Sequence, residues 1–384
     1  MIKQLNLVHD YHDIFTLSQF AFQYKLSEED LAKKRQEAER HTIWGVMVEE
    51  KLAAKLHLIP LTVTIHGKPF EMGGISSVAT WPEFRRNGMV KYLLAHALQH
   101  MKENDQLISY LHPFSVPFYR KYGWEITFNE KLYKIPFDKL KQNWNVDGYV
   151  RRIKPDIDLL NNVYLNYAKN YTGPILRDEK WWKQRVLKDD VHIAMAFHET
   201  GQPEGYIVFE VKDKLFTVIE IAYQSLKGLK LLMQFIGNHD SMAENAELVV
   251  PENDNIPLLL REPRFETKVD PYFMARVVDV RKFLEQYPFV SSTSNDTISI
   301  YVEDEFLPDN TGTYCLHQGG KVVTYETKKE VGVICTIQQF TVMFLGYKRP
   351  LDLYHLGLIQ GDVQAINKLE QLIPRQQTYF PDFF

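Results

Sequence analysis

The sequence has little of what marks metal-binding, secreted or membrane proteins. Only two cysteines, Cys315 and Cys335, occur among 384 residues, and they do not have the spacing of metal ligands, so we expect free thiols. The 13 histidines form no HExxH pattern. No apolar stretch approaches the ~20 residues that cross a bilayer, and the N-terminus lacks the apolar segment of a signal peptide. The sequence therefore predicts a cytoplasmic protein without a metal and without a membrane span.

A strong charge of either sign is also missing. Lysine and arginine number 45 against 49 aspartates and glutamates, which leaves a net charge of −4 and no long basic run. We therefore expect no nucleic-acid partner. The sequence contains no Gly-x-Ser-x-Gly elbow, no repeat of fixed period and no low-complexity segment. What remains is a globular chain, 45% hydrophobic, with enough residues for two or three domains.

The N-terminal third alternates between strand and helix patterns. Strands are predicted over residues 42–48, 51–65, 70–80 and 106–111, with a final strand over 124–135. Apolar residues at positions 89, 90, 93, 94, 97, 98 and 101 share one face of a 3.6-residue period, which predicts an amphipathic helix after Gly88.

The segment between the third of these strands and that helix reads ATWPEFRRNGMV. Unpaired backbone N–H groups and aligned peptide dipoles make the start of a helix attractive to anions. Gly88 lets the backbone approach such an anion, and Arg85 and Arg86 can donate charge-assisted bonds to phosphate oxygens. Pro82 lacks an N–H, so we expect it to open the strand end for an extended ligand. The other interpretation is a solvated basic turn.

In its position after three strands, this loop resembles the pyrophosphate loop of the GNAT acetyltransferase superfamily. That loop has the form Arg/Gln-x-x-Gly-x-Gly/Ala, and residues 85–90 match it except that Val90 stands at the last position. The resemblance implies acetyl-CoA as co-substrate. It implies that the following residues contact acetyl-CoA: Val78, Ala79, Thr80, Arg85, Arg86, Asn87, Gly88, Met89, Val90, Lys91, Phe114 and Ser115.

Over its whole length the chain is similar to the Eis (enhanced intracellular survival) family of N-acetyltransferases. The similarity depends on this loop, on the stretch FYRKYGWE at residues 118–125 and on the aromatic C-terminus. It implies a mixed α/β fold with a GNAT domain over residues 1–148, a GNAT-like domain over 149–274 and a sterol-carrier-like α+β domain over 275–384. It also implies a homo-oligomer, such as a hexamer.

The stretch FYRKYGWE contains the residue that the resemblance implies as general acid, Tyr119. Acyl transfer from a thioester expels a thiolate, and a thiol of pKa ~8.5 accepts a proton or a strong hydrogen bond from a tyrosine of pKa ~10. Tyr122, three residues later, is the competing candidate. Either tyrosine is also interpretable as a packed aromatic residue.

The chain ends in PRQQTYFPDFF, with four aromatic residues among the last six. We expect such a tail to be buried in a cleft, since exposing it to water is unfavourable. The resemblance implies that the carboxylate of Phe384 is the general base, and Asp382 is a candidate acidic wall residue. The alternative is a hydrophobic plug without chemistry. Trp181 and Trp182 are interpreted as core residues in preference to the wall of a cleft.

The predicted function is N-acetylation of a primary amine by direct transfer in a ternary complex. The family's acceptors, aminoglycosides and protein lysines, imply a cationic amine-bearing small molecule or a lysine side chain as partner. The rival function is a lipid or sterol carrier whose CoA-binding domain is not catalytic.

Overall fold

The computed structural model describes residues 1–188, 190–290, 297–317, 322–326 and 332–384. These residues divide into two compact units. Unit 1 contains residues 1–127, 273–375 and 384, and unit 2 contains residues 128–272 and 376–383. Each unit draws on separate stretches of the chain, and the domain boundaries expected after residues 148 and 274 stay a prediction.

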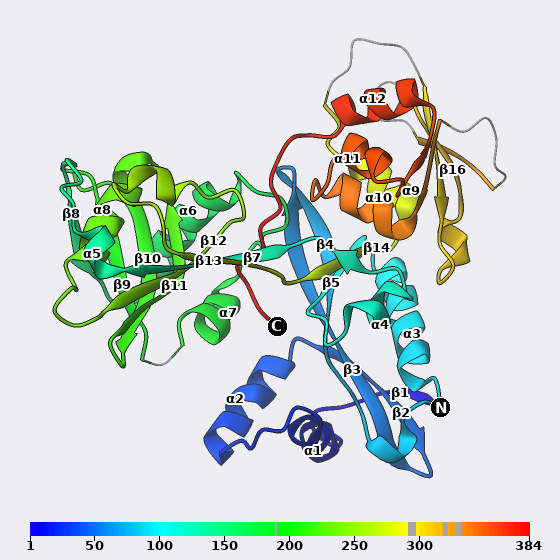
Figure 1. Cartoon of the computed structure of the whole chain (residues 1–384). Helices are drawn as coiled ribbons and strands as arrows, with labels where there is room; N and C mark the ends of the chain where they lie inside the picture. Colours follow the sequence, from blue (N-terminus) through cyan, green and yellow to red (C-terminus); the bar gives the residue numbers. More distant parts are fainter. Residues whose placement is uncertain (189, 291–296, 318–321, 327–331) are drawn as a thin grey trace. The chain divides into compact units, whose positions relative to one another are not determined.

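The first sheet of unit 1 has the strand order β1-β2-β3-β4-β5-β14-β6 (Figure 1). Most neighbours are antiparallel, and β4 and β5 are parallel. Its strands are β1 (Ile2–Gln4), β2 (Thr42–Val48), β3 (Lys51–Ile65), β4 (Lys68–Thr80), β5 (Ile108–Leu111), β6 (Glu125–Ile126) and β14 (Met274–Val277). The single strand expected over residues 124–135 is wrong, because β6 ends at Ile126 and the next strand belongs to the sheet of unit 2.

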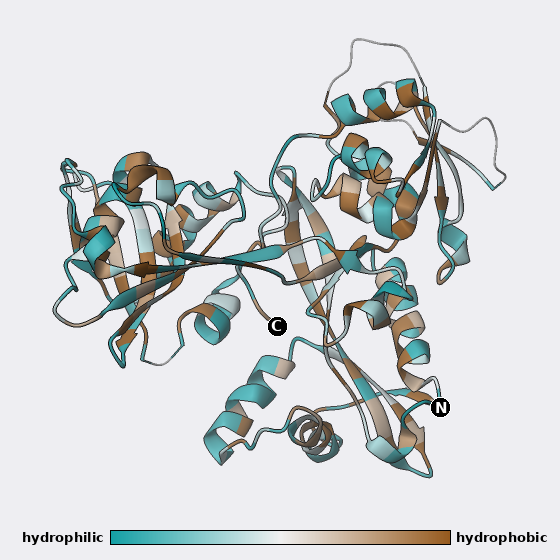
Figure 2. Cartoon of the chain, viewed as in Figure 1, coloured by the Kyte–Doolittle hydropathy of each residue, from teal (hydrophilic) through white to brown (hydrophobic). Residues whose placement is uncertain are grey.

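Helices cover both faces of this sheet. The amphipathic helix α3 (Met89–Glu103) packs a stripe of fully buried residues against one face, as its periodicity predicts. They are Leu93, Leu94, Ala97, Leu98 and Met101. Helix α1 (Tyr11–Ala21) packs on the opposite face. Helix α2 (Glu28–Ala38) begins at Ser27, whose hydroxyl accepts from the backbone N–H of Asp30 at 3.1 Å. Figure 2 shows α2 as mostly hydrophilic, in agreement with its exposed side chains.

The C-terminal part of unit 1 is a smaller sheet with the strand order β17-β16-β15-β18-β19. Helix α10 packs against this sheet and also against β14 and β6 of the first sheet. The elements are α9 (Val280–Gln286), β15 (Ile298–Glu303), β16 (Gly312–Leu316), β17 (Val322–Tyr325), β18 (Val333–Thr336), α10 (Ile337–Phe344), α11 (Pro350–His355), β19 (Gln360–Gly361) and α12 (Val363–Leu372).

Unit 2 is a second mixed sheet, with the strand order β13-β7-β12-β11-β10-β9-β8. Its strands are β7 (Asn129–Pro136), β8 (Tyr149–Arg152), β9 (His192–Phe197), β10 (Pro203–Lys212), β11 (Leu215–Tyr223), β12 (Asn245–Val250) and β13 (Glu266–Pro271). Helices α5 (Phe137–Leu140) and α8 (Leu226–Gly237) pack on one face. Helix α6 (Ile157–Ala168) and the short α7 (Glu179–Trp181) pack on the other face, where the rings of Tyr164, Trp182 and Tyr206 meet.

Candidate functional site

Strands β4 and β5 run side by side and then separate. Residues 72–75 of β4 pair with residues 108–111 of β5, after which β5 ends. Strand β4 continues to Thr80 with β3 as its neighbour. The opening therefore comes from the early end of β5. The expectation that Pro82 opens the strand is wrong, since Pro82 lies beyond β4 in a 3₁₀ turn, η1 (Pro82–Phe84).

A β-bulge lies in β4 where the two strands separate. The register of β4 against β3 shifts between the partners of His57 and Lys55, and Ser77 there has a φ of 52°. Directly after the bulge, Val78 packs toward the α3 side of the sheet and Ala79 toward the α1 side. Three of the residues predicted to contact acetyl-CoA, Val78 to Thr80, therefore form the end of β4 that pairs with β3 but no longer with β5.

The predicted anion loop joins η1 to the start of α3. Arg86 and Gly88 both have left-handed backbones, with φ of 66° and 74°. Gly88 is the N-cap of α3, and no side chain caps the helix there. The first intrahelical bond runs from Tyr92 N–H to Gly88 O at 3.1 Å, so three backbone N–H groups precede it without a helical partner. The first turn has no acidic residue, and these features suit an anion.

Most side chains around this loop are exposed to solvent, and one packs against the core. Arg85, Arg86, Asn87 and Lys91 are exposed. Val90, which departs from the GNAT pattern, packs against the core between α3 and the sheet. Its side chain therefore points away from the exposed loop, and the departure from the pattern does not change the uncapped start of α3.

Helix α4 (Val116–Arg120) follows β5 and positions Tyr119. Ser115 is its N-cap, and the ring of Phe114, which is 72% exposed, lies 5.4 Å from that of Tyr119. Tyr119 itself is 3% exposed, with its ring edge-on to Phe118 and Trp124. Burial raises the pKa of the Tyr119 hydroxyl, and this hydroxyl makes no hydrogen bond to another described residue.

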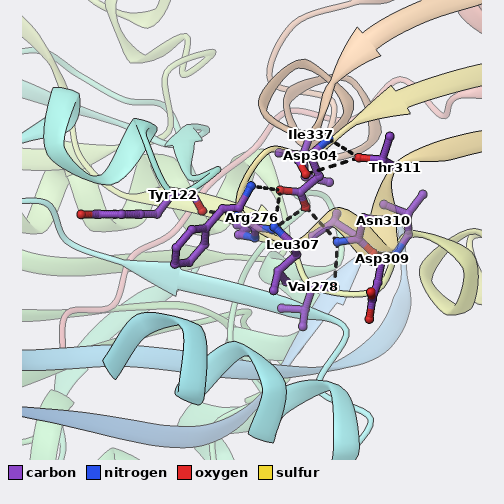
Figure 3. Close-up of polar contacts among 12 residues, drawn as sticks. Tyr122, Arg276, Val278, Asp304, Leu307, Asp309, Asn310, Thr311 and Ile337 are labelled. Carbon is purple, nitrogen blue, oxygen red and sulfur yellow. Dashed lines mark hydrogen bonds and ion pairs between the residues drawn. The ribbon is translucent and has the colours of Figure 1, made fainter. Parts of the chain in front are cut away.

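Tyr122, the competing tyrosine, has different surroundings. Its ring packs on Phe306, with ring centres 4.8 Å apart, and its carbonyl accepts a hydrogen bond from Arg276 (Figure 3). Gly123 has a φ of 89°, and a side chain there would collide with the Arg276 guanidinium. The glycine in FYRKYGWE is therefore needed both for the turn and for the close approach of Arg276.

Arg276 is a residue that the sequence analysis missed. It lies in β14, is fully buried and donates from Nη2 to Asp304 at 2.5 Å. Asp304 in turn accepts from the backbone N–H groups of Phe306 and Leu307 and from the amide of Asn310 (Figure 3). Arg276 thus connects the turn after α4 to the C-terminal part of unit 1. The sequence feature that could have identified this residue is a charged arginine inside the otherwise apolar strand Met274–Val277.

The last residue, Phe384, lies against the first sheet. It is 6% exposed, and its ring packs edge-on against that of Phe273 at 5.2 Å. A methyl group at Gly74 would lie 2.9 Å from two carbons of the Phe384 ring. At the adjacent Gly73 it would meet Met101 of α3 at 2.7 Å. Because neighbouring strand residues face opposite sides, Phe384 lies on the sheet face that is opposite to α3.

The preceding tail residues belong to unit 2. Residue 378 forms a parallel bridge with Thr172, and Tyr379 and Phe380 are buried as predicted. Phe383 is 53% exposed, so the expectation of a fully buried aromatic tail is wrong at this residue.

Asp382 does not form an acidic wall. The residue is 4% exposed. Its carboxylate pairs with Arg177, Nε to Oδ1, at 3.0 Å, and it accepts from Trp181 Nε1 at 2.7 Å. Arg177 also binds Glu220. Burial raises the pKa of Asp382. The residue is therefore part of a buried ionic cluster, and Trp181 is a core residue, as interpreted.

The described residues offer no cluster of three or more histidine, cysteine, aspartate or glutamate side chains that would hold a metal ion. In the same part of the chain, no helix is long and apolar enough to cross a membrane.

Three family models match the chain. Two acetyltransferase (GNAT) domain models match residues 3–127 and 173–277, and a sterol carrier protein domain model matches residues 280–381. An uncharacterized N-acetyltransferase of Streptomyces griseus is 25% identical over 343 residues, or 77% of each chain.

Solved structures extend the likeness to the full length. A conserved Enterococcus faecalis protein, described as a probable N-acyltransferase, has a TM-score of 0.94 and 27% identity, with 100% of this chain and 99% of that one covered. Eis1 from Mycobacterium abscessus has a TM-score of 0.83 over 100% of both chains, and at 18% identity this likeness concerns the fold.

The geometry and these matches agree. One GNAT model matches residues 3–127. This range contains the separation of β4 from β5, the uncapped start of α3 and helix α4 with Tyr119. The rival interpretation as a lipid carrier is not favoured, because acetyltransferase domains account for two of the three matches. The chain is an acetyltransferase of the GNAT type, in which two acetyltransferase domains precede a sterol carrier protein domain.

Proposed function

We propose that this enzyme transfers the acetyl group of acetyl-CoA to a primary amine, directly and within a ternary complex. The observation that supports this proposal most is the geometry of residues 76–91. There the end of β4, which no longer pairs with β5, is followed by a left-handed loop and by the uncapped start of α3. A nucleotide thioester needs both parts: free backbone groups along an extended arm and N–H groups toward a diphosphate.

The residues present fit acetyl-CoA. The backbone of Val78 to Thr80 binds the pantetheine arm, and the N–H groups of Met89 to Lys91 hold the pyrophosphate. Arg85, Arg86 and Asn87 add charge and hydrogen bonds from the exposed loop. Phe114 and Ser115 flank the thioester end. The thioester supplies an acyl group that is activated toward attack by an amine.

Tyr119 is the donor to the leaving sulfur. Its buried hydroxyl keeps its proton at neutral pH because burial raises its pKa, and it has no hydrogen-bond partner among the described residues. It therefore donates to the sulfur as negative charge develops there. Tyr122 is not proposed for this role, since its ring packs on Phe306.

The carboxylate of Phe384 is the general base. An acceptor that enters as an ammonium ion must lose protons before and during attack, and overall one proton is released for each amide formed. The ring of Phe384 packs against Gly74 and Phe273 on the sheet face opposite to α3, and this position beside β4 supports the proposal. A hydrophobic plug would use the same ring without needing the carboxylate.

The acceptor is a cationic amine-bearing small molecule or a lysine side chain. The buried ionic cluster neutralises Asp382, so this residue does not support an acidic acceptor pocket. The homo-oligomer, such as a hexamer, remains a prediction that sedimentation of the purified enzyme would check.

The proposal is tested by measuring acetyl-CoA turnover with polyamines, aminoglycosides and lysine peptides, using the native chain and a chain extended by two residues after Phe384. We expect turnover with at least one amine class, and its loss on extension with acetyl-CoA binding retained. Equal turnover by both chains would rule out the terminal carboxylate as base. Failure of the native chain to bind acetyl-CoA would overturn the proposal as a whole.

A further inference from the structure

Strand β3 contains a fully buried lysine. Lys55 has 0% of its surface exposed and lies in a strand whose neighbouring residues, Ala54 and Leu56, belong to the apolar core against α3. Among the described residues no carboxylate lies within ion-pair distance of its amine. Burying a lysine amine without a carboxylate costs folding free energy unless other groups form hydrogen bonds with it. The groups that bind this amine therefore indicate its role.

The amine of Lys55 is bound mainly to one residue. Its Nζ lies 3.0 Å from the carbonyl oxygen of Ser77, 2.8 Å from the Ser77 hydroxyl and 3.1 Å from His57 Nε2. Burial lowers the pKa of Lys55 to about 7 and that of His57 well below its usual value. A neutral amine still donates two hydrogens to Ser77 while its lone pair accepts from His57. Both bonds to Ser77 therefore persist in either protonation state.

Ser77 is the residue that needs to be held. Its φ of 52° is uncommon outside glycine and persists only where the surroundings fix it. Besides the two bonds from Lys55, its hydroxyl lies 3.4 Å from the Ser18 hydroxyl of α1. Ser18 also donates to Ile14 O, and either hydroxyl could be the donor in the contact between Ser18 and Ser77. The bulge is thus tied to β3 and to α1.

The bulge that Lys55 binds lies where β4 separates from β5. The register shift falls between the β4 partners of Lys55 and His57, two residues after pairing with β5 ends at Ile75. Without the extra residue of the bulge, Val78 to Thr80 would shift by one position, and their N–H groups and side chains would change sides.

We infer that Lys55 is a positioning residue for acetyl-CoA binding: it holds the left-handed bulge at Ser77 and so directs the backbone of Val78 to Thr80 toward the thioester arm. Lys55 does this without contacting acetyl-CoA. The inference rests on the proposed function for the ligand, and on the observed hydrogen bonds for the bulge.

The test compares Lys55→Met, Ser77→Gly and the double variant. Lys55→Met should fold, since it removes a buried amine, and we expect its dissociation constant for acetyl-CoA to rise about tenfold because nothing then offsets the strain at Ser77. Ser77→Gly should bind within about threefold of the wild type, since glycine adopts positive φ readily. In the double variant glycine should restore most of the affinity lost by Lys55→Met. A lysine needed only for stability would not be rescued in this way.

Two further measurements keep the inference testable. Lys131→Met removes a lysine of unit 2 that also donates to backbone carbonyls, and it should leave acetyl-CoA affinity unchanged. Ser77→Val, with Lys55 intact, should weaken binding, because a β-branched residue resists positive φ.

Crystal structures of the wild type and Lys55→Met separate this inference from the proposed function. Loss of the bulge in the variant supports the inference, and an unchanged bulge overturns it, even if the wild type does not bind acetyl-CoA. Wild-type affinity in Lys55→Met, or a double variant no better than Lys55→Met, would also overturn it.

Discussion

The ring of Phe384 lies over Gly74, in the part of β4 that still pairs with β5. A methyl group at position 74 would come within 2.9 Å of two ring carbons, closer than side-chain carbons normally approach. The Phe384 ring therefore packs on β4, the strand that we propose for acetyl-CoA binding, at a position where only glycine leaves room for it.

Replacement of Gly74 by valine should displace the Phe384 ring. We expect kcat to fall by at least about tenfold, because a base that shifts by an ångström loses much of its effect, while the dissociation constant for acetyl-CoA changes little. Gly45→Val is the control, since a side chain at Gly45 of β2 would also be crowded, by Leu52 at 2.6 Å, but would not meet the tail. It should lower thermal stability without a selective loss of kcat. Equal effects of both variants on kcat would contradict the prediction.

Tyr119→Phe should lower kcat by about 100-fold, within the range that general acids contribute. The KM for acetyl-CoA should hardly change, because the hydroxyl acts on charge that develops in the transition state. Steady-state kinetics of the purified enzyme measure both quantities. Tyr122→Phe is the matched control and should retain activity. If Tyr122→Phe were the slower enzyme, the two tyrosines would have to exchange roles.

The sequence was most informative where a local pattern has a single structural solution. The apolar stripe of α3, the glycine before it and the run FYRKYG each determine a local geometry without knowledge of the rest of the chain. The early end of β5, the bulge at Ser77 and the pairing of Arg276 with Asp304 depend on residues far apart in sequence. Lys55 and Arg276 gave only an indirect signal, a charged residue inside an apolar strand.

The contacts of the C-terminal tail were also not predictable from local sequence. Its aromatic residues predict burial, but the sequence does not show that Asp382 would meet Arg177, or that Phe383 alone would stay exposed. A carboxylate near a proposed base looks like an acceptor-binding group until its buried partner is known.

The double variant Arg86→Glu and Gly88→Val should weaken acetyl-CoA binding by at least about 100-fold. It reverses a charge next to the proposed diphosphate site, and it places a β-branched residue at a φ of 74° where glycine is needed. Calorimetric titration with acetyl-CoA measures the effect. Lys214→Glu, at an exposed site of unit 2, is the control for charge and should bind as the wild type does. Unchanged affinity in the loop variant would remove the loop from the site.

Asp382→Ala should destabilise unit 2 by about 3 kcal/mol, because it leaves the buried Arg177 with one carboxylate in place of two. Chemical denaturation followed by tryptophan fluorescence measures the loss, since Trp181 also loses its bond to Asp382. Asp270→Ala breaks an exposed pair with Lys268 and should cost less than about 1 kcal/mol. Equal losses in the two variants would show that the buried cluster adds no special stability.

The stability of the wild type should depend on pH through Lys55. Burial lowers the pKa of this amine in the folded protein from 10.5 to about 7, so between these values the unfolded chain binds a proton that the folded chain does not. Stability therefore rises with pH across this window, by up to about 1.4 kcal/mol per pH unit, and this contribution is constant below pH 7.

Lys55→Met lacks this proton and should be more stable than the wild type near pH 7, with the difference shrinking as the pH approaches 10. Urea denaturation of both proteins at several pH values gives the difference in the free energy of unfolding directly. His57, which contacts Lys55, has its pKa lowered mainly by burial and so stays neutral in both folded proteins above pH 7. The remaining titrating groups are common to the two proteins and cancel in that difference. A difference that stays the same from pH 7 to pH 10 would mean that Lys55 keeps its ordinary pKa, and that the amine beneath the bulge is solvated in the folded enzyme.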